Sequence, residues 1–436
     1  MKKILIFGAG KSATFLIEYV CSACEENNWE LLLCDADLAL AQSKIAGCNN
    51  AIAIAADVSN ETRRKELIQD VDIVISMLPP QLHFLVANDC LDFSKNLLTA
   101  SYIDENIKKL NKKIEQKGLL FLCEMGLDPG IDHMSAMKII NQVEKEGGKI
   151  TSFRSHCGGL VSPESDDNPW HYKITWNPGN IVMAGSSGAV YRDRGEIVNI
   201  LYPDIFLDSK VVDVPGLFPL AWYPNRDSLT YINTYGLNDI DTFIRTTLRH
   251  PSFCRGWNTI VNMGLTDLND HEEIKNCKTY YEWFEQKNKT TGSPVYLNEK
   301  EKEFADQADY LGLRSNDSVE AKINNSALLL QTILERKLAM RDHDKDMIVM
   351  LHEIEYEING ENKEIRSSLV VKGEDQRKTA MAKTVGLPLG IAAKLLLQNK
   401  IKLTGLHIPV LPEIYEPVLA ELEEHGIKFN EGISLG

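Results

Sequence analysis

The N-terminal segment KILIFGAGKSATFLIEYV, residues 3–20, constrains the fold more strongly than any other part of the chain. Its first five residues predict a buried strand, and the pattern G-x-G-x-x-A follows at the start of a predicted helix. Gly8 permits a tight turn, Gly10 lets the backbone approach a pyrophosphate, and Ala13 lets helix and strand pack closely. We therefore predict a dinucleotide-binding loop at a helix N-terminus. Its predicted contacts are Gly8, Gly10, Lys11, Ser12 and Ala13.

Strand-like and helical segments alternate through the first part of the chain. Further apolar strand patterns begin near residues 29, 71, 96 and 119, with helical patterns between them. Continuous apolar strands separated by helices are typical of a parallel sheet that is covered on both faces. The predicted fold class is therefore α/β, with a Rossmann-type doubly wound parallel sheet.

The end of the second predicted strand bears on the choice of nucleotide. A carboxylate at Asp35 would accept hydrogen bonds from the adenosine ribose hydroxyls and would repel a 2′-phosphate. No arginine lies in residues 34–42, although Lys44 follows, so these residues favour NAD over NADP. Asp57 could reach the adenine end or could cap a helix, and both interpretations are compatible with the sequence.

The motif SMLPP at residues 76–80 ends the next predicted strand. Two prolines stop the strand and shape a loop at the carboxyl edge of the sheet, where a bound dinucleotide crosses. Ser76 and Leu78 are therefore predicted cofactor contacts. A purely structural turn is the alternative interpretation.

Composition places the chain among soluble globular proteins and limits its partners. At 436 residues it exceeds one ordinary core, so two or three domains are expected. The formal net charge of −15 argues against nucleic acid as a partner, because phosphate binding requires a basic surface. Nine cysteines lack metal-ligand spacing, and the apolar N-terminal stretch is too short for a signal peptide or a membrane span. We expect a cytoplasmic protein with free thiols, no metal and no membrane partner.

The pattern changes after about residue 150. Segments such as ITSFRSHCGGL, YKITW, GAVYRD and TYINTY are strand-like, and residues 250–345 are mostly helical. Asn359-Gly360 between two apolar segments predicts a β-hairpin. Residues 379–401 predict a packed helix that could return to the first domain.

Several side chains in this second region could carry chemistry. Cys157 precedes two glycines and is either an exposed thiol or a small core residue. Arg226 lies in a predicted turn, and Thr247 and Arg249 lie at the end of a predicted strand. A single arginine is usually solvated, but two on one ligand-facing sheet would suit a substrate with several carboxylates, because guanidinium pairs bidentately with carboxylate.

The segment GLDPGIDHMSA, residues 126–136, allows two interpretations. Pro129 and Gly130 restrict and turn the backbone, so Asp128 could be an aimed carboxylate that transfers protons. Asp128 could also be a helix N-cap followed by proline at the first helical position. Both roles can coexist.

Taken together, GLDPGIDH, SHCGGLVSPE, YKITWNPGN, YPNRDS, TAMAKTVGLP and HIP…EIYEPVL resemble the saccharopine dehydrogenase family, and most closely its glutamate-forming branch. The resemblance runs in order from about residue 4 to 420. It implies a Rossmann domain at 1–126 joined by the C-terminal segment 380–436. Between them, residues 127–379 would form a second α/β domain for substrate binding and homodimer formation, with a helical part at about 250–345.

The resemblance implies an NAD(P)-dependent oxidoreductase that interconverts saccharopine with L-glutamate and 2-aminoadipate 6-semialdehyde. By motif, Tyr102, Asp128 and Cys157 match ionisable groups discussed for acid–base roles, and Trp176 would lie near the cofactor or substrate. The implied substrate contacts are Ser101, Tyr102, Asp128, Arg226, Thr247, Leu248 and Arg249. Relatives of this branch commonly use NADP, whereas Asp35-Ala36-Asp37 departs from their basic residue after the second strand.

Two alternative functions remain compatible with the nucleotide loop. A carboxynorspermidine-type Schiff-base reductase of the same superfamily would call for acidic residues in place of Arg226 and Arg249. A non-catalytic nucleotide-binding sensor would be expected to lack Asp128, Cys157 or the arginines, all of which are present. The direction of the reaction is not set by these residues.

Overall fold

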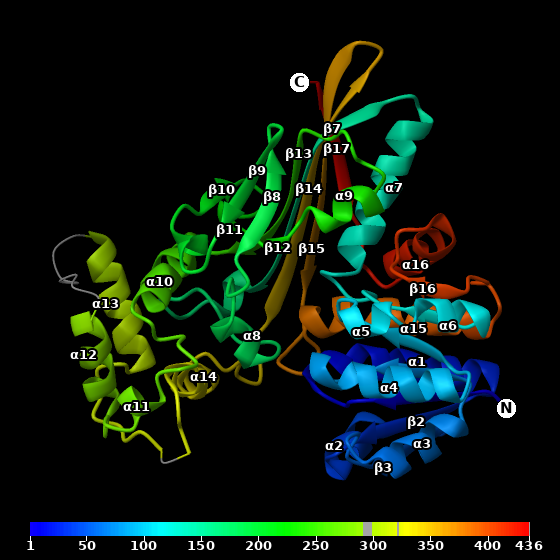
Figure 1. Ribbon diagram of the computed structural model, residues 1–436, viewed down its shortest axis with the longest axis horizontal. Coiled ribbons are helices and arrows are strands. Elements are labelled where there is room, and N and C mark those ends of the chain that lie inside the picture. The colour runs from blue at the N-terminus through cyan, green and yellow to red at the C-terminus, as the bar shows by residue number, and fades with distance from the viewer. Residues whose placement is uncertain (291–298, 321, 436) are drawn as a thin grey trace. The chain divides into compact units, whose positions relative to one another are not determined.

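The structure is a computed structural model that describes residues 1–290, 299–320 and 322–435 (Figure 1). It divides into two compact units. The first unit comprises Met1–Gly147 and Arg377–Lys428, and the second comprises Gly148–Gln376 and Phe429–Gly436. Each unit has its own sheet, and each is described separately below.

The first unit is built on a parallel sheet. Within the described residues its seven strands have the order β16-β6-β5-β4-β1-β2-β3, and every neighbouring pair is parallel. The strands are β1 Lys3–Phe7, β2 Glu30–Asp35, β3 Ala51–Ala55, β4 Ile73–Ser76, β5 Asn96–Thr99, β6 Leu120–Leu122 and β16 Gly405–His407. The predicted Rossmann-type sheet is confirmed. Its strand order reverses direction between β1 and β4, which is where Rossmann domains bind dinucleotides.

Helices of the first unit follow the strands, as a doubly wound fold requires. They are α1 Thr14–Asn27, α2 Leu38–Lys44, α3 Glu61–Gln69, α4 Pro80–Asp92, α5 Glu105–Lys108, α6 Asn111–Gln116, α7 Ile131–Lys145, α15 Ala380–Leu397 and α16 Pro412–Glu424. Helix α15 packs closely on α1. The close approach is seen at Gly386, where a Cβ would lie only 2.8 Å from the Leu16 nitrogen. By length and composition α15 could cross a membrane, but 78% of it is buried, as in the core helix of a soluble protein.

The second unit is built on a mixed sheet. Among the described residues its main path runs β10-β11-β13-β7-β14-β15-β17; off this path, β8 pairs with β13, and β9 and β12 pair with β8. β13 runs parallel to β7, whereas the other neighbours on this path are antiparallel. The strands are β7 Lys149–Val161, β8 Ala189–Asp193, β9 Glu196–Ile200, β10 Lys210–Val212, β11 Leu220–Pro224, β12 Arg226–Asp227, β13 Thr242–Arg249, β14 Asp346–Ile358, β15 Glu361–Lys372 and β17 Asn430–Leu435. The predicted second α/β part and the hairpin at Asn359-Gly360 are confirmed.

Six helices of the second unit contribute to an aromatic core that contains Trp170, Trp257 and Trp283. Among the described residues these helices are α8 Pro178–Val182, α10 Pro251–Asn262, α11 His271–Ile274, α12 Tyr280–Thr290, α13 Glu299–Leu311 and α14 Ser326–Lys337. Helix α9, Thr230–Thr234, lies outside this core (Figure 1). Two predicted strands are wrong. TYINTY forms helix α9, and YKITW makes only an isolated bridge at Ile174.

The unit boundaries differ from the predicted division in two places. Helix α7 packs against α16, so the first unit extends to Gly147 instead of residue 126. The last strand, β17, pairs with β15, so residues 429–435 belong to the second unit and not to the Rossmann unit. Both differences arise from contacts between segments that are far apart in the sequence.

Candidate functional site

The glycine-rich loop has the shape that a dinucleotide requires. Gly8 has a φ of +100°, and a Cβ there would lie 2.9 Å from the Met77 carbonyl oxygen, so only glycine fits. A Cβ on Gly10 would meet no atom of the described residues within 4 Å, so its backbone is open to a ligand. Ala13 is buried, whereas Ser12 is half-buried and Lys11 is exposed in the short 3-10 helix that leads into α1. These residues fit a bound pyrophosphate.

Asp35 joins this loop to the end of β2. Its Oδ2 accepts a hydrogen bond from the Ala9 nitrogen at 2.7 Å, and its Oδ1 accepts from the Asp37 nitrogen at 2.9 Å. The carboxylate thus lies where Rossmann domains hold the adenosine ribose. Lys44 lies on the following helix, where its amine donates to Thr14 Oγ1 and burial lowers its pKa.

Asp57 follows β3 and is exposed. Its Oδ1 accepts from the Ser59 nitrogen at 2.8 Å, and the hydrogen bonds from Ser59 lower the pKa of the carboxyl. The N-cap of α3 is Asn60, whose side chain accepts from the Arg63 nitrogen. The interpretation of Asp57 as a helix N-cap is therefore wrong, and its carboxylate closes a turn instead.

The SMLPP motif both ends a strand and begins a helix. Ser76 is the last residue of β4 and pairs with Phe7 of β1 at the reversal of the strand order. Leu78 is half-buried, Pro79 is the N-cap of α4, and Pro80 is the first residue of that helix. Proline is favoured at this position because its missing N–H would have no helical partner.

A buried imidazole connects the carboxyl ends of β4 and β5. His83 of α4 is 3% exposed, and its Nδ1 lies 2.8 Å from Ser76 Oγ while its Nε2 lies 2.7 Å from Ser101 Oγ. Burial lowers the pKa of His83 to about 4, so the ring is neutral near pH 7. Sequence reasoning missed His83. The available signal was its place in the first turn of a helix that directly follows the cofactor-side strand.

Asp128 lies at the tip of a closed backbone loop. The Gly126 nitrogen donates to the Pro129 carbonyl oxygen at 3.0 Å. Gly130 has a φ of +149°, and a Cβ there would overlap the Gly126 carbonyl. Helix α7 begins at Ile131 with Gly130 as N-cap, so the interpretation of Asp128 as the N-cap is wrong. From residue 119 to residue 137, every residue except Asp128 is buried.

Tyr102 is the neighbour of Asp128. Its hydroxyl lies 3.5 Å from Asp128 Oδ1, and both residues are half-buried. The two come together because the chain after β5 pairs with the chain after β6: the Glu124 nitrogen donates to the Ser101 carbonyl at 3.1 Å. The structure therefore places three predicted residues, Ser101, Tyr102 and Asp128, in one region of the first unit.

The buried side chains of Glu124 and His133 contact each other next to this region. Glu124 has a φ of +57° and is 4% exposed, an unusual backbone conformation for a residue other than glycine. Its Oε2 lies 2.9 Å from His133 Nε2, and its Oε1 accepts from the Ile103 nitrogen at 3.3 Å. These contacts fix the backbone on both sides of Tyr102 and Asp128.

In the second unit, Cys157 lies inside the sheet. It pairs with Thr247 of β13 and Met350 of β14, and it is 5% exposed. The interpretation of Cys157 as an exposed thiol is therefore wrong. The adjacent Gly158 is required because a Cβ there would overlap the carbonyl of Leu248, which is itself fully buried.

Arg249, at the end of β13, is a buried cation. It is 6% exposed, its Nη1 donates to the Leu248 carbonyl at 2.8 Å, and its Nε has no hydrogen-bond partner among the residues that the structure describes. The guanidinium carbon lies 5.3 Å from the centre of the Tyr172 ring, and Cys157 and Tyr223 are electrostatic neighbours. Within the part of the chain that the structure describes, no carboxylate forms an ion pair with Arg249. A buried guanidinium without a counter-charge is suited to bind an anion.

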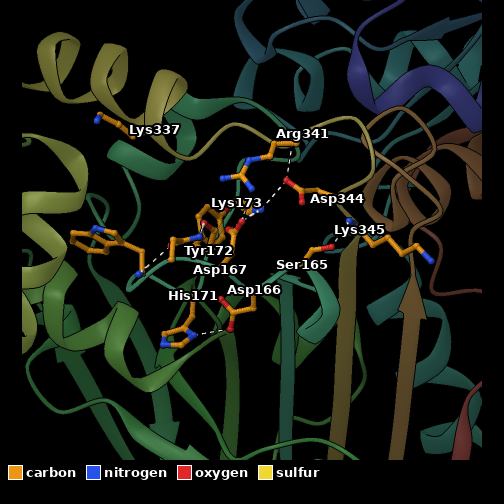
Figure 2. A network of polar contacts seen from close by, with 12 residues as sticks. Ser165, Asp166, Asp167, His171, Tyr172, Lys173, Lys337, Arg341, Asp344 and Lys345 are labelled. Atoms are coloured by element: carbon orange, nitrogen blue, oxygen red, sulfur yellow. Dashed lines mark hydrogen bonds and ion pairs between the residues drawn. The ribbon is translucent and has the colours of Figure 1, made fainter.

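The loop that carries Tyr172 is held by a group of ion pairs (Figure 2). Lys173 is 3% exposed, and its Nζ forms ion pairs with Asp344 Oδ2 at 2.7 Å and Asp167 Oδ1 at 2.9 Å. Trp176, farther along the loop, is half-buried and its Nε1 donates to the Tyr172 hydroxyl at 3.4 Å. Tyr172 thus contacts both Trp176 and Arg249. No sequence signal identified Tyr172, because its role depends on strands far away in the chain.

The predicted arginines occupy different strands. Arg226 is exposed, has a φ of +53° and begins β12, which pairs with β8. Thr247 is half-buried on β13, opposite Tyr223 of β11. The structure therefore brings Thr247, Leu248 and Arg249 together with Cys157 and Trp176, whereas Arg226 lies on a neighbouring strand.

Comparison with known proteins adds an independent observation. Residues 4–122 match the family described as saccharopine dehydrogenase NADP binding domain, and residues 126–427 match the saccharopine dehydrogenase C-terminal domain. The chain belongs to the saccharopine dehydrogenase family. Within this family, the chain is 31% identical to saccharopine dehydrogenase [NADP(+), L-glutamate-forming] of Saccharomyces cerevisiae, over 99% of both chains.

Two further comparisons, one with a solved structure and one with a longer protein, define how far the likeness extends. The solved apo saccharopine dehydrogenase (L-Glu forming) from Saccharomyces cerevisiae superimposes with a TM-score of 0.90 at 29% identity, covering 100% of both chains. The α-aminoadipic semialdehyde synthase of Arabidopsis thaliana is 33% identical over 98% of this chain but only 44% of its own length. The chain thus spans about half the length of that relative.

Proposed function

We propose that this chain is an L-glutamate-forming saccharopine dehydrogenase, which interconverts saccharopine with L-glutamate and 2-aminoadipate 6-semialdehyde. The observation that carries the proposal is Arg249, a buried guanidinium without a carboxylate partner among the described residues. Saccharopine has three carboxylates, and a carboxylate would supply the missing counter-charge. Relatives of full length that carry this name support the assignment.

The reaction requires proton transfers that the first unit can perform. The secondary amine of saccharopine must be neutral before its carbon can be oxidised to an iminium. Water then adds to the iminium carbon, and glutamate leaves as an amine that takes up a proton. Asp128 suits this exchange, because it is half-exposed at the tip of a rigid loop and has Tyr102 as a neighbouring donor.

The nucleotide would be held by residues of the first unit. When bound, the nicotinamide supplies the redox chemistry by accepting hydride from the substrate. The open backbone at Gly10 would face the pyrophosphate, and Asp35 would accept from ribose hydroxyls. Asp35 favours NAD, whereas the full-length fungal relatives are named for NADP(+), so both nucleotides belong in the test.

The experiment is a comparison of initial rates of reduced-nicotinamide formation from saccharopine with NAD and with NADP. We expect saccharopine-dependent absorbance with at least one nucleotide, and a Lys44→Ala variant should weaken NADP selectively if Lys44 holds the 2′-phosphate. Turnover with a diamine plus aspartate semialdehyde, and none with saccharopine, would replace the proposal with the Schiff-base reductase. Nucleotide binding without any turnover would support the sensor.

We also propose that the chain forms a homodimer through its second unit. Four large apolar side chains between residues 196 and 212 are exposed in the single chain. They are Ile197 at 63%, Leu201 at 69%, Leu207 at 68% and Val211 at 59%. Exposed apolar groups of this kind are typical of association surfaces. Sedimentation should give the mass of two chains, and an Ile197→Glu, Leu201→Glu double variant should give one; a monomeric wild type contradicts the proposal.

A further inference from the structure

The Ser76–His83–Ser101 chain has a place in the fold that suggests a function. Ser76 ends β4 beside β1, at the reversal of strand order where the glycine loop lies. Ser101 follows β5 and is adjacent in sequence to Tyr102, whose hydroxyl lies 3.5 Å from Asp128. His83 therefore links the nucleotide edge of the sheet to the region around Asp128 through two short hydrogen bonds.

A neutral imidazole has one N–H, so the direction of the two hydrogen bonds is coupled. If Nε2–H donates to Ser101 Oγ, then Nδ1 accepts from the Ser76 hydroxyl, and the proton of Ser101 remains available to another acceptor. In the opposite tautomer Nε2 is an acceptor, and Ser101 Oγ at 2.7 Å is a much nearer donor to it than Thr99 Oγ1 at 3.5 Å. Ser101 then donates to His83 and offers only its lone pairs to a ligand. Ser101 is half-buried. Among the described residues, His83 is the side chain that lies within hydrogen-bonding distance, 2.7 Å, of the Ser101 hydroxyl.

We propose that His83 is a positioning residue that presents Ser101 as a hydrogen-bond donor to a carboxylate of the substrate. An anionic substrate selects the tautomer with the proton on Nε2, because only then can Ser101 donate outward. Ser76, 1% exposed, acts as the fixed donor that completes the chain. This inference rests on the proposed function, since it takes the carboxylates of saccharopine as the anionic groups.

Two amide variants test the contacts of the two imidazole nitrogens of His83 separately. In His83→Gln the side-chain amide can reach the position of Nε2 and keep a donor to Ser101. In His83→Asn the amide reaches only the position of Nδ1, so the contact with Ser76 remains and the contact with Ser101 is lost. The control is Val86→Ala, which removes two methyl groups of a fully buried side chain on the same helix and leaves the polar chain intact.

The measurements are KM and kcat for saccharopine, and calorimetric binding of nucleotide alone and of saccharopine to the nucleotide-loaded protein. We expect His83→Asn to raise KM about tenfold, the effect of losing one hydrogen bond to a charged group. Nucleotide affinity should stay within about twofold, and His83→Gln should restore KM. Ser101→Ala should raise KM equally, and combining it with His83→Asn should add little.

Other outcomes overturn the inference. A rise in KM no larger than that of Val86→Ala would reduce His83 to a packing residue. Equal losses of nucleotide and saccharopine affinity would mean that His83 supports the sheet edge as a whole. A wild-type protein that binds nucleotide but neither binds nor turns over saccharopine would remove the proposed function, and this inference with it. Saccharopine turnover with unchanged KM in His83→Asn would remove this inference alone.

Discussion

Two buried polar clusters, one in each unit, differ in how their hydrogen bonds are satisfied. In the first unit, Ser76, His83 and Ser101 satisfy one another, and the loop below Asp128 is closed by backbone hydrogen bonds. In the second unit, the Arg249 guanidinium is buried with an unsatisfied Nε. Buried polar groups are normally paired, so an exception needs an explanation, and a bound anion would provide one here. The comparison suggests that the first unit is preorganised for proton transfer, whereas the second completes its hydrogen bonding only when an anion binds.

The largest effect is expected at Asp128. Asp128→Asn keeps the shape of the side chain but removes the group that accepts a proton, so kcat should fall by about 10²–10⁴-fold. The free energy of unfolding should hardly change, because Asp128 is half-buried at the tip of the loop and the Gly126–Pro129 backbone hydrogen bond closes that loop. Steady-state kinetics and thermal unfolding check the two halves of this prediction.

Asp132 provides the matched control for Asp128. Its Oδ1 accepts from the Gly130 nitrogen at 2.6 Å, at the start of the same helix. Asp132→Ala should therefore lower the free energy of unfolding by about 1–2 kcal/mol. Near-normal turnover of Asp128→Asn would show that another group transfers the proton. Asp128 and Asp132 would then no longer differ as a catalytic and a structural aspartate.

The next effect tests the unsatisfied arginine against a satisfied one. Arg249→Met should lower kcat/KM for saccharopine by about 100-fold, because a substrate carboxylate loses its buried partner. The free energy of unfolding should stay the same or rise, since an unpaired buried charge is replaced by an apolar side chain of similar volume. Kinetics and denaturant titration measure both quantities.

Arg64 in the first unit is the control for Arg249. It is equally buried, but its Nε lies 2.6 Å from Asp89 Oδ2. Arg64→Met would leave Asp89 as an uncompensated buried charge and should lower the free energy of unfolding by about 3–5 kcal/mol. Similar losses of unfolding free energy in Arg249→Met and Arg64→Met would imply that Arg249 already has a counter-charge. They would contradict the view that its counter-charge comes from a bound ligand.

The sequence predicted the first unit better than the second, for a physical reason. The signals for β1, the glycine loop and α1 are local: an apolar run, glycines at fixed spacing and helical periodicity. In the second unit, TYINTY is rich in β-branched and aromatic residues, yet Ile232 and Tyr235 are buried three residues apart, as on one face of a helix. Tertiary packing overrode the local β-propensity there.

The candidate site shows the same division. The glycine loop and the turn at Asp128 were visible in the sequence, because glycine and proline restrict the backbone locally. The partners of His83 lie on two different strands, and the surroundings of Arg249 come from β7, β11 and the loop before α8. Such contacts depend on strand order, which sequence periodicity does not encode.

A smaller effect is expected at two glycines, one in each unit. A Cβ on Gly130 would overlap the Gly126 carbonyl, and a Cβ on Gly158 would overlap the Leu248 carbonyl. Each alanine variant should lower the free energy of unfolding by about 2–3 kcal/mol, because the backbone must shift. Gly10→Ala, with nothing within 4 Å, is the control and should leave stability unchanged. Unchanged stability of Gly158→Ala would mean that β13 can move away from β7, so Arg249 would not be held rigidly.

The smallest effect concerns pH, and His83 in the first unit and His250 in the second test it. Burial lowers the pKa of His83 to about 4. The pKa of His250 is also lowered to about 4, first by burial and second by the charge of His171, whose ring stacks on it. Because each folded pKa lies below the unfolded value of about 6.5, the unfolded state binds the proton first. The stabilisation is complete above about pH 6.5 and is lost progressively as the pH falls toward about 4.

Between pH 6.5 and 5.5, the loss for a histidine as buried as His83 should be about 1 kcal/mol. It should be smaller for His250, which is half-buried and has Asp166 and Glu303 among its acidic neighbours. Urea titrations across this range should show a shallower pH dependence for His83→Gln than for the wild type, and an intermediate slope for His250→Gln. An unchanged slope in His83→Gln would mean that its imidazole can be protonated without loss of folding free energy. The Ser76–His83–Ser101 chain would then tolerate two N–H donors, and its contrast with the unsatisfied Arg249 would weaken.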